Sequence, residues 1–276
     1  MYTDWFKLTK LPFRLRPDAD FLYLSDRSAR VYADLREAAS GEYGVACLIG
    51  EPGVGKTTLL HALARDYQDS VSVARIQQPD ITAEELTATI TEQFNLGPQG
   101  EGPQSGRTAL QRFVKNAKAR GRTVAILVDE AHQCSIPILS ELLQIAAQSP
   151  APLIVLAGSS ALRTSLASLA PLNKPLPIIL MLELPRLSKS QIAGYIEFRL
   201  KVAGSDGRRL FEPETVAEIW RYTGGTPQLI NTLCDSAMML AEAHSVALVG
   251  VVEIREAVQQ LNWVEFSARI DATPAT

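Results

Sequence analysis

The chain has 276 residues, of which 46% are hydrophobic, 21% charged and 7% aromatic, with 17 glycines and 16 prolines. This average usage excludes a disordered, collagen-like or disulfide-scaffold protein, and the length is sufficient to bury a core in one large or two small domains. A formal net charge of −3 excludes a whole-molecule field that would hold a polyanion, so contact with nucleic acid would need a local basic patch.

The first 25 residues contain scattered aromatic residues broken by turn signals, a pattern too interrupted for a helix and too apolar for a free tail. We expect this segment to pack onto the first domain. A helix is predicted from about Ser25 to Ala39, so that residues 1–43 form an N-terminal aromatic segment and helix.

From residue 44 the sequence alternates short β-branched runs with helical segments, as in the crossovers of a parallel sheet. Strands are predicted at Val45–Ile49, Val71–Ile76, Val124–Val128, Leu153–Ala157 and Ile178–Leu182. Helices are predicted at Lys56–Tyr67, Ala83–Phe94, Thr108–Ala119, Ile136–Ala147 and Ala161–Leu169. The fold class is therefore α/β, a parallel sheet flanked by helices over residues 44–185, with a mobile loop predicted at Gly97–Gly106.

After Pro185 the strand signals stop and helical spacing takes over. We expect a separate helical lid domain over residues 186–262, followed by a frayed tail at 263–276.

A phosphate-binding loop is the strongest functional signal. The stretch from Gly50 to Thr57 matches the Walker A pattern GxxxxGK[ST] and lies between a predicted strand and a predicted helix. Its glycines let successive N–H groups converge on phosphate oxygens, Lys56 brings a positive charge to the β- and γ-phosphates, and Thr57 places a hydroxyl beside Mg²⁺. The predicted nucleotide-binding residues are Gly50, Glu51, Pro52, Gly53, Val54, Gly55, Lys56, Thr57 and Thr58.

Two carboxylates, Asp129 and Glu130, follow the third predicted strand, as in a Walker B element. They lie at the carboxyl edge, where open α/β sheets bind ligands. Asp129 would hold Mg²⁺ and Glu130 would orient and polarise the attacking water. Taken alone, the pair could equally be the acidic start of a helix. Beside the glycine loop it favours binding of a nucleoside triphosphate with Mg²⁺.

These motifs, followed by a helical region, resemble those of AAA+ ATPases. More narrowly, the sequence is similar to the ExeA/GspA family of secretion ATPases and its shorter relative MshM of type IV pilus systems. The similarity extends over residues 2–243 and includes Pro12-Phe13, Phe21 to Ser25, Leu156-Ala157-Gly158 and Gly224 to Pro227. It implies a P-loop ATPase that forms a homo-oligomer and assembles a secretion or pilus machine. Longer members continue into a membrane helix and a peptidoglycan-binding domain that this sequence lacks. We therefore expect membrane contact through an inner-membrane partner.

The sequence departs from this family at three positions. Ser159 stands where relatives have a glutamine that can sense the γ-phosphate, and Gln228 replaces the arginine of the lid motif. Before the fifth strand, where relatives have an arginine finger, the chain reads Lys174-Pro175-Leu176-Pro177. Because an arginine finger contributes on the order of 10³ to 10⁵ in rate, we expect ATP binding with slow basal hydrolysis. Arg163, Lys174 and Arg186 are candidate substitute cations.

Six cations from Arg107 to Arg122 have no acidic residue between them: Arg107, Arg112, Lys115, Lys118, Arg120 and Arg122. They form either a solvated helix face or a DNA-backbone contact, as in a transposition ATPase of the TniB/TnsC kind. A third hypothesis is a nucleotide-gated interaction module with little turnover. His132, next to the two acids, is interpreted as a helix-start residue.

The three cysteines, Cys47, Cys134 and Cys234, are widely spaced and lie in no CxxC or Cys/His cluster, so neither a disulfide framework nor a zinc site is indicated. The longest apolar runs fall far short of the roughly 18 to 20 residues of a membrane helix. The sequence thus predicts a cytoplasmic protein without direct membrane insertion, peripheral to the inner membrane at most through a partner.

Overall fold

A computed structural model describes residues 1–39, 44–67, 71–77, 81–97, 103–169, 177 and 179–266. The chain divides into two compact units. The sheet unit comprises Asp26–Pro52 and Leu59–Leu184, and the helical unit comprises Met1–Ser25, Gly53–Thr58 and the segment from Pro185 onward. Each unit is described by itself below.

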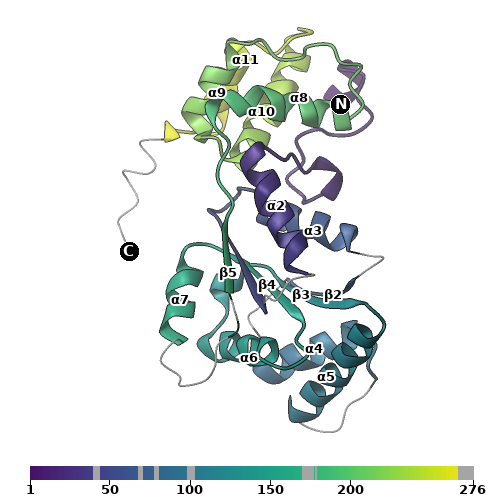
Figure 1. Ribbon diagram of the computed structural model, residues 1–276. Coiled ribbons are helices and arrows are strands. Elements are labelled where there is room, and N and C mark those ends of the chain that lie inside the picture. Colours follow the sequence, from purple (N-terminus) through teal and green to yellow (C-terminus); the bar gives the residue numbers. More distant parts are fainter. Residues whose placement is uncertain are drawn as a thin grey trace. The chain divides into compact units, whose positions relative to one another are not determined.

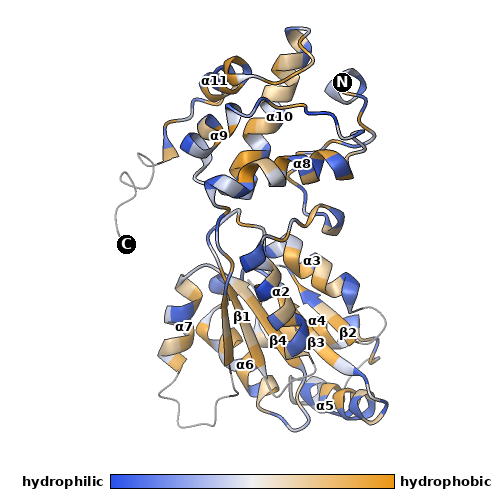
Figure 2. Ribbon diagram, turned by 45° about the horizontal axis from the view of Figure 1, so that its top comes forward, coloured by the Kyte–Doolittle hydropathy of each residue, from blue (hydrophilic) through white to orange (hydrophobic). Residues whose placement is uncertain are grey.

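The sheet unit is built on five parallel strands in the order β2-β3-β4-β1-β5 (Figure 1). They are β1 Val45–Ile49, β2 Val71–Ile76, β3 Thr123–Val128, β4 Leu153–Gly158 and β5 Ile179–Glu183. Every residue of β1 and β4 is buried, and both strands are coloured as hydrophobic in Figure 2. Such uninterrupted burial is typical of central parallel strands that are covered on both faces. The predicted α/β class is confirmed.

Helix α2 precedes β1, and the other helices of this unit lie between consecutive strands. They are α2 Asp26–Ala38, α3 Lys56–Asp66, α4 Ala83–Gln93, α5 Pro103–Ala119, α6 Ile136–Ala146 and α7 Ala161–Leu169, with a short 3₁₀ helix, η2, at Ala131–Gln133. Helices α4 to α7 form one hydrophobic cluster with alternate strand residues such as Cys47, Ile126 and Ile154, and α2 and α3 lie on the other face of the sheet (Figure 1). This layering leaves the carboxyl edge of the strands available for a ligand.

Helix α5 begins five residues earlier than predicted, so the expected loop at Gly97–Gly106 is wrong over residues 103–106. A proline is tolerated in the first turn of a helix, where its missing N–H costs no hydrogen bond. Gly106 also sits so close to α4 that an added Cβ would lie 2.5 Å from Thr87 Cγ2. Pro103 and Gly106, which the sequence analysis assigned to a loop, therefore belong to a helix that packs closely on α4. Residues 98–102 of the expected loop lie outside the described part of the chain.

The helical unit contains α8 Ile192–Val202, α9 Thr215–Thr223, α10 Pro227–Ala243 and α11 Val251–Gln260, preceded by a 3₁₀ turn, η3, at Lys189–Gln191. Its core gathers residues from all four helices, including Ile196, Ile219, Leu233 and Ile254. The helical character expected after Pro185 is present. Of the expected tail, residues 267–276 lie outside the described part of the chain.

The N-terminal segment differs from its prediction in two ways. Residues 2–5 form a one-turn helix, α1 Tyr2–Trp5, and a 3₁₀ turn, η1, follows at Ala19–Phe21. Residues 1–25 also belong to the helical unit rather than packing on the sheet unit, because Tyr2, Phe6 and Phe13 are buried in the core of the C-terminal helices. Of the predicted N-terminal region 1–43, the part from Asp26 onward, which contains α2, belongs to the sheet unit.

A buried guanidinium fixes the N-terminal segment to α8. Arg199 donates from Nε to the Pro12 carbonyl at 2.5 Å and from Nη2 to the Arg14 carbonyl at 3.3 Å. Its Nη1 donates to the hydroxyl of Tyr195 at 3.1 Å. The aromatic residues alone did not indicate this arrangement, since they specify burial and not the partner that buries them. Among the described helices, none is both long and apolar enough to cross a lipid bilayer.

Candidate nucleotide site

The glycine-rich loop leaves the sheet at the end of β1. Gly50 donates its N–H to the Gly158 carbonyl at 3.0 Å, so the loop starts beside the end of β4. Residues Gly50, Glu51 and Pro52 belong to the sheet unit, and Glu51 and Pro52 are exposed. The predicted loop thus begins at the carboxyl edge of the central strands, as its motif requires.

The second half of the loop, Gly53–Thr58, belongs to the helical unit. Gly53 and Gly55 have φ angles of +78° and +105°, which favour glycine. A Cβ added to Gly55 would meet no heavy atom within 4 Å, so open space adjoins the loop on that side. Successive N–H groups in such a conformation form a concavity suited to anions.

Lys56, Thr57 and Thr58 form the first turn of α3. Lys56 is buried, at 5% exposure, and Val54 is buried beside it in sequence, whereas Thr57 and Thr58 are half-buried. The positive end of an eleven-residue helix and a lysine ammonium therefore occur in the same turn. Open space at Gly55, a helix start and a buried cation together fit a phosphate chain.

Gln228 lies directly against this loop. It is the second residue of α10, and its N–H donates to the Gly53 carbonyl at 3.1 Å. A Cβ added to Gly53 would be 2.7 Å from Gln228 Oε1, so only glycine fits at that point of the loop. The structure therefore brings together two residues that the sequence placed in the nucleotide site, although they are 175 positions apart (228 − 53).

The two carboxylates occupy the end of β3. The side chain of Asp129 is held at the strand end, where the residue is 8% exposed and its N–H donates to the Ile76 carbonyl at 2.9 Å. Glu130 has φ +49° and ψ +34°, a left-handed conformation that costs a non-glycine residue roughly 1–2 kcal/mol. Its N–H donates to Asp129 Oδ1 at 2.9 Å. The turn ends the strand and leaves the Glu130 side chain 41% exposed.

His132 connects Glu130 to the end of β4. Its Nδ1 accepts a hydrogen bond from the N–H of Ser159 at 3.4 Å, and the same atom lies 3.5 Å from Glu130 Oε2 without donating to it. A Cβ on Gly158 would lie 3.1 Å from the His132 N, which shows how tightly η2 packs on β4. His132 lies in η2, in agreement with its interpretation as a helix-start residue, and it also contacts Ser159. The sequence signal for a contact with Glu130 was the position of His132 two residues after it.

We expect His132→Ala to lower ATP turnover about tenfold and leave ATP affinity within about twofold, because the Glu130 side chain loses the ring that lies beside it and links η2 to Ser159. Phosphate-release kinetics at saturating ATP measure the first quantity and calorimetry the second. His132→Asn, whose amide can accept the Ser159 hydrogen bond, should recover part of the rate. An unchanged rate for His132→Ala would contradict a positioning role.

The candidate substitute cations are placed differently from one another. Arg163 is paired with Glu183 at 3.1 Å, and both side chains are exposed. The guanidinium of Arg186 lies over the ring of Phe266, 4.5 Å from its centroid. Lys174 lies outside the described residues. None of these observations assigns a finger role.

The basic run on α5 contains fewer unpaired cations than its sequence indicated. Arg107 forms a two-point ion pair with Glu141, which is 3% exposed on α6. Glu141 could not be predicted as the partner of Arg107, because it lies 34 positions away in the sequence. The other five cations are exposed and form no ion pair with another described residue: Arg112, Lys115, Lys118, Arg120 and Arg122.

Comparison with known proteins agrees with this geometry. Residues 39–166 match the family described as AAA domain. The chain is 30% identical over 254 residues to General secretion pathway protein A of Aeromonas hydrophila, a match that covers 88% of this chain and 45% of that protein. The chain thus spans less than half the length of that relative.

Solved structures share the architecture at low identity. The ORC2 protein of Aeropyrum pernix matches with a TM-score of 0.65 and 18% identity, over 91% of this chain and 71% of that chain. Cdc6p of Pyrobaculum aerophilum matches with a TM-score of 0.65 and 17% identity, over 88% and 70%. The RuvB Holliday junction branch migration motor of Thermotoga maritima matches with a TM-score of 0.57 and 18% identity, over 91% and 74%. Identity at this level establishes the fold alone.

The sheet order, the glycine loop before α3 and the matched residues define the class: residues 39–166 match an AAA domain, and the chain has an AAA+ fold. The similarity to General secretion pathway protein A agrees with the narrower resemblance found in the sequence.

Proposed function

We propose that this protein binds ATP with Mg²⁺, hydrolyses it slowly when alone, and uses the nucleotide to drive assembly of a bacterial secretion or type IV pilus system. The observation that carries the proposal is the loop Gly50–Thr57, with open space at Gly55 and a buried Lys56 at the start of α3. The secretion context is supported by the similarity to General secretion pathway protein A.

The chain's own residues divide the chemistry among them. The N–H groups of the loop and the Lys56 ammonium bind the phosphates, with Thr57 and Asp129 as the oxygen ligands for Mg²⁺. Mg²⁺ supplies charge neutralisation on the phosphate oxygens when bound. Glu130 holds the attacking water and accepts its proton, and the His132 ring lies beside the Glu130 carboxylate. Ser159 offers a hydroxyl for the γ-phosphate, and Gln228 contributes its amide from α10.

Slow basal turnover follows from the missing arginines. The sequence has no arginine at the finger position before β5, and glutamine replaces arginine in the lid motif. A neighbouring subunit or a partner that donates a cation should therefore raise the rate. Brisk turnover by the isolated protein would contradict this proposal.

Calorimetry with Mg²⁺-ATP on the folded chain tests binding directly, and light scattering with ADP and with ATP tests assembly. We expect binding and an ATP-dependent increase in mass. The partner is proposed to be an inner-membrane secretion or pilus assembly protein, which places this chain at the cytoplasmic face. Binding without any change in mass would favour the nucleotide-gated module with little turnover.

The exposed cations of α5 and of the turn that follows it support a second candidate, an ATP-dependent DNA-binding regulator of the transposition type. Five cations that are free of ion pairs with other described residues could contact successive phosphates of a duplex, and repeated copies in an oligomer would add avidity. Mass growth only in the presence of both ATP and duplex DNA would favour this candidate.

For that candidate we expect the double variant Arg112→Gln/Lys115→Gln to reduce by about 2 the slope of log affinity against log salt, because two phosphate contacts are lost. Fluorescence anisotropy with labelled duplex DNA, at several salt concentrations and with ATP present, measures the slope. The matched control Arg27→Gln/Arg30→Gln removes the same charge from exposed positions of α2 and should leave the slope unchanged. If log affinity falls with log salt equally steeply for both variants, α5 does not contact DNA.

A further inference from the structure

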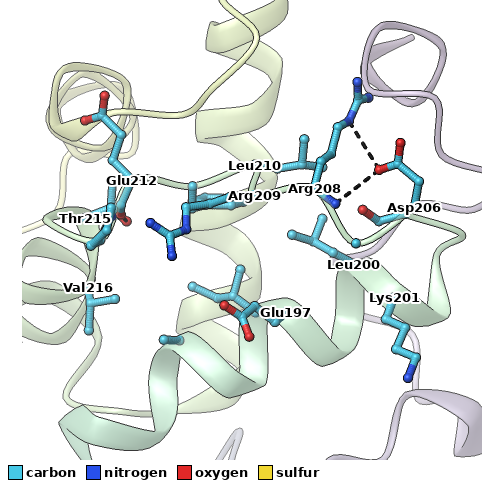
Figure 3. Close-up of a pocket in the computed structure, with 16 residues that line it drawn as sticks. Glu197, Leu200, Lys201, Asp206, Arg208, Arg209, Leu210, Glu212, Thr215 and Val216 are labelled. Atoms are coloured by element: carbon cyan, nitrogen blue, oxygen red, sulfur yellow. Dashed lines mark hydrogen bonds and ion pairs between the residues drawn. The ribbon is translucent and has the colours of Figure 1, made fainter.

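Helix α8 has polar side chains on two faces. Glu197 and Lys201 line a pocket of about 730 Å³ between α8 and the chain that leads into α9 (Figure 3). The lining of this pocket contains three acidic and three basic side chains, so it presents no excess charge to a ligand. Tyr195 and Arg199 do not line the pocket, and both are buried, at 4% and 6% exposure. Their polar groups therefore find their partners inside the helical unit.

A chain of hydrogen bonds runs from the N-terminal segment through α8 to α10. Arg199 holds the carbonyls of Pro12 and Arg14. Its Nη1 donates to the Tyr195 hydroxyl at 3.1 Å, and that hydroxyl donates to Asn231 Oδ1 at 2.7 Å. Burial raises the pKa of Tyr195, so the hydroxyl keeps the proton that it donates. Asn231 is 6% exposed, and a hydrogen bond shielded from water in this way fixes the groups that it joins.

Asn231 lies one helical turn after the residue that contacts the glycine-rich loop. Gln228, three positions earlier on α10, donates its N–H to the Gly53 carbonyl at 3.1 Å. A Cβ added to Gly53 would also lie 3.1 Å from Thr226 Cγ2, so the start of α10 packs closely on the loop. Residues three apart are neighbours on a helix surface, and the helical backbone between them is rigid. The position of Asn231 therefore determines the position of Gln228, and all of these residues belong to the helical unit.

We propose that Tyr195 and Asn231 are positioning residues for the nucleotide loop. Their hydrogen bond places the first turn of α10, so that Gln228 holds Gly53 in the conformation that receives the phosphates. The apolar contacts of α10 in the core are not directional, whereas a hydrogen bond has a preferred distance and angle. The polar pair thus adds an accuracy of placement that apolar packing does not supply. This inference rests on the proposed function, because it assigns the pair a role in ATP binding.

Two substitutions of nearly equal shape at Asn231 test the proposal. Asn231→Asp keeps an oxygen that accepts from Tyr195, and Asn231→Leu removes it. We expect Asn231→Leu to weaken binding of Mg²⁺-ATP about fivefold and to raise KM by a similar factor, because the loop loses a well-placed partner. Its kcat should stay within about twofold of the wild type, since Glu130 belongs to the sheet unit. Asn231→Asp should bind ATP within about twofold of the wild type. Calorimetry measures the affinity, and phosphate release measures KM and kcat.

Thr215→Val is the matched control for lost stability. Thr215 is fully buried at the start of α9, and its hydroxyl donates to the Glu212 carbonyl. The substitution removes one buried hydrogen bond from the same unit with little change of shape, and that bond does not involve α10. Thermal unfolding establishes that every variant is folded at the assay temperature. Thr215→Val should then bind ATP as the wild type does.

Amide hydrogen exchange of the free protein, followed by NMR, reports on the loop contact without nucleotide. The Gln228 N–H should exchange at least about fivefold faster in Asn231→Leu than in the wild type or in Thr215→Val. The Glu212 N–H, which is bonded to the Val249 carbonyl elsewhere in the unit, should change little.

Three results would overturn the inference: wild-type ATP affinity in Asn231→Leu, equal weakening in Asn231→Asp, or unchanged exchange of the Gln228 N–H. A wild-type protein that binds no ATP would contradict the proposed function itself. In that case the exchange of the Gln228 N–H would still decide whether Asn231 positions the loop.

Discussion

Glu130→Gln should lower ATP hydrolysis by about 100-fold or more while ATP binding stays within about twofold of the wild type. A glutamine amide has nearly the shape of the carboxylate but cannot accept the proton of the attacking water. Glu130 is suited to that task because its left-handed turn at the end of β3 leaves it partly exposed next to a buried Asp129. Radiometric phosphate release, sensitive enough for slow basal turnover, measures the rate, and calorimetry measures the affinity.

A matched control is Glu92→Gln, which neutralises an exposed carboxylate on α4 and should leave both quantities unchanged. Hydrolysis by Glu130→Gln at the wild-type rate would show that Glu130 is not the catalytic base. A parallel loss of affinity and rate would instead indicate a distorted loop. Because the Glu130→Gln variant should trap the ATP-bound form, light scattering on it also tests whether bound ATP, and not its hydrolysis, drives assembly.

The centre of the sheet was predictable because β1, β3 and β4 are buried almost throughout. Runs such as Val45–Ile49 and Leu153–Ala157 are apolar at every position, and short helices between them require right-handed crossovers to a parallel sheet. The glycine loop was predictable for a local reason, since its conformational needs are met by residues adjacent in sequence. The apolar runs and the glycine motif depend only on residues that are adjacent along the chain, so a single sequence is enough to recognise them.

Features that depend on distant partners were not predictable. Nothing near Arg107 in sequence indicates Glu141, and nothing near Pro12 indicates Arg199. The packing of residues 1–25 on the C-terminal helices was missed for the same reason, because apolar side chains specify burial without specifying a surface. The family resemblance indicated Gln228 as a lid residue at the nucleotide, and the structure adds its hydrogen bond to the Gly53 carbonyl, a long-range contact that periodicity cannot predict.

Lys56→Ala is expected to weaken ATP binding by about 100-fold. The variant loses a charge-assisted contact to phosphate oxygens, and the helix start and loop N–H groups remain. Calorimetry with Mg²⁺-ATP measures the loss. Lys189→Ala, which removes an exposed lysine from η3, serves as the control and should bind normally.

Because Lys56 is buried, its removal could also alter the fold, and thermal unfolding separates the two effects. Saturating ligand at 100 times its dissociation constant stabilises the native state by about 2.7 kcal/mol. The wild type and Lys189→Ala should therefore melt at higher temperature with Mg²⁺-ATP. Lys56→Ala should melt cooperatively without nucleotide and gain little from it. An equal gain in Lys56→Ala would mean that ATP, if it binds, does so away from the loop, and the proposed site would be wrong.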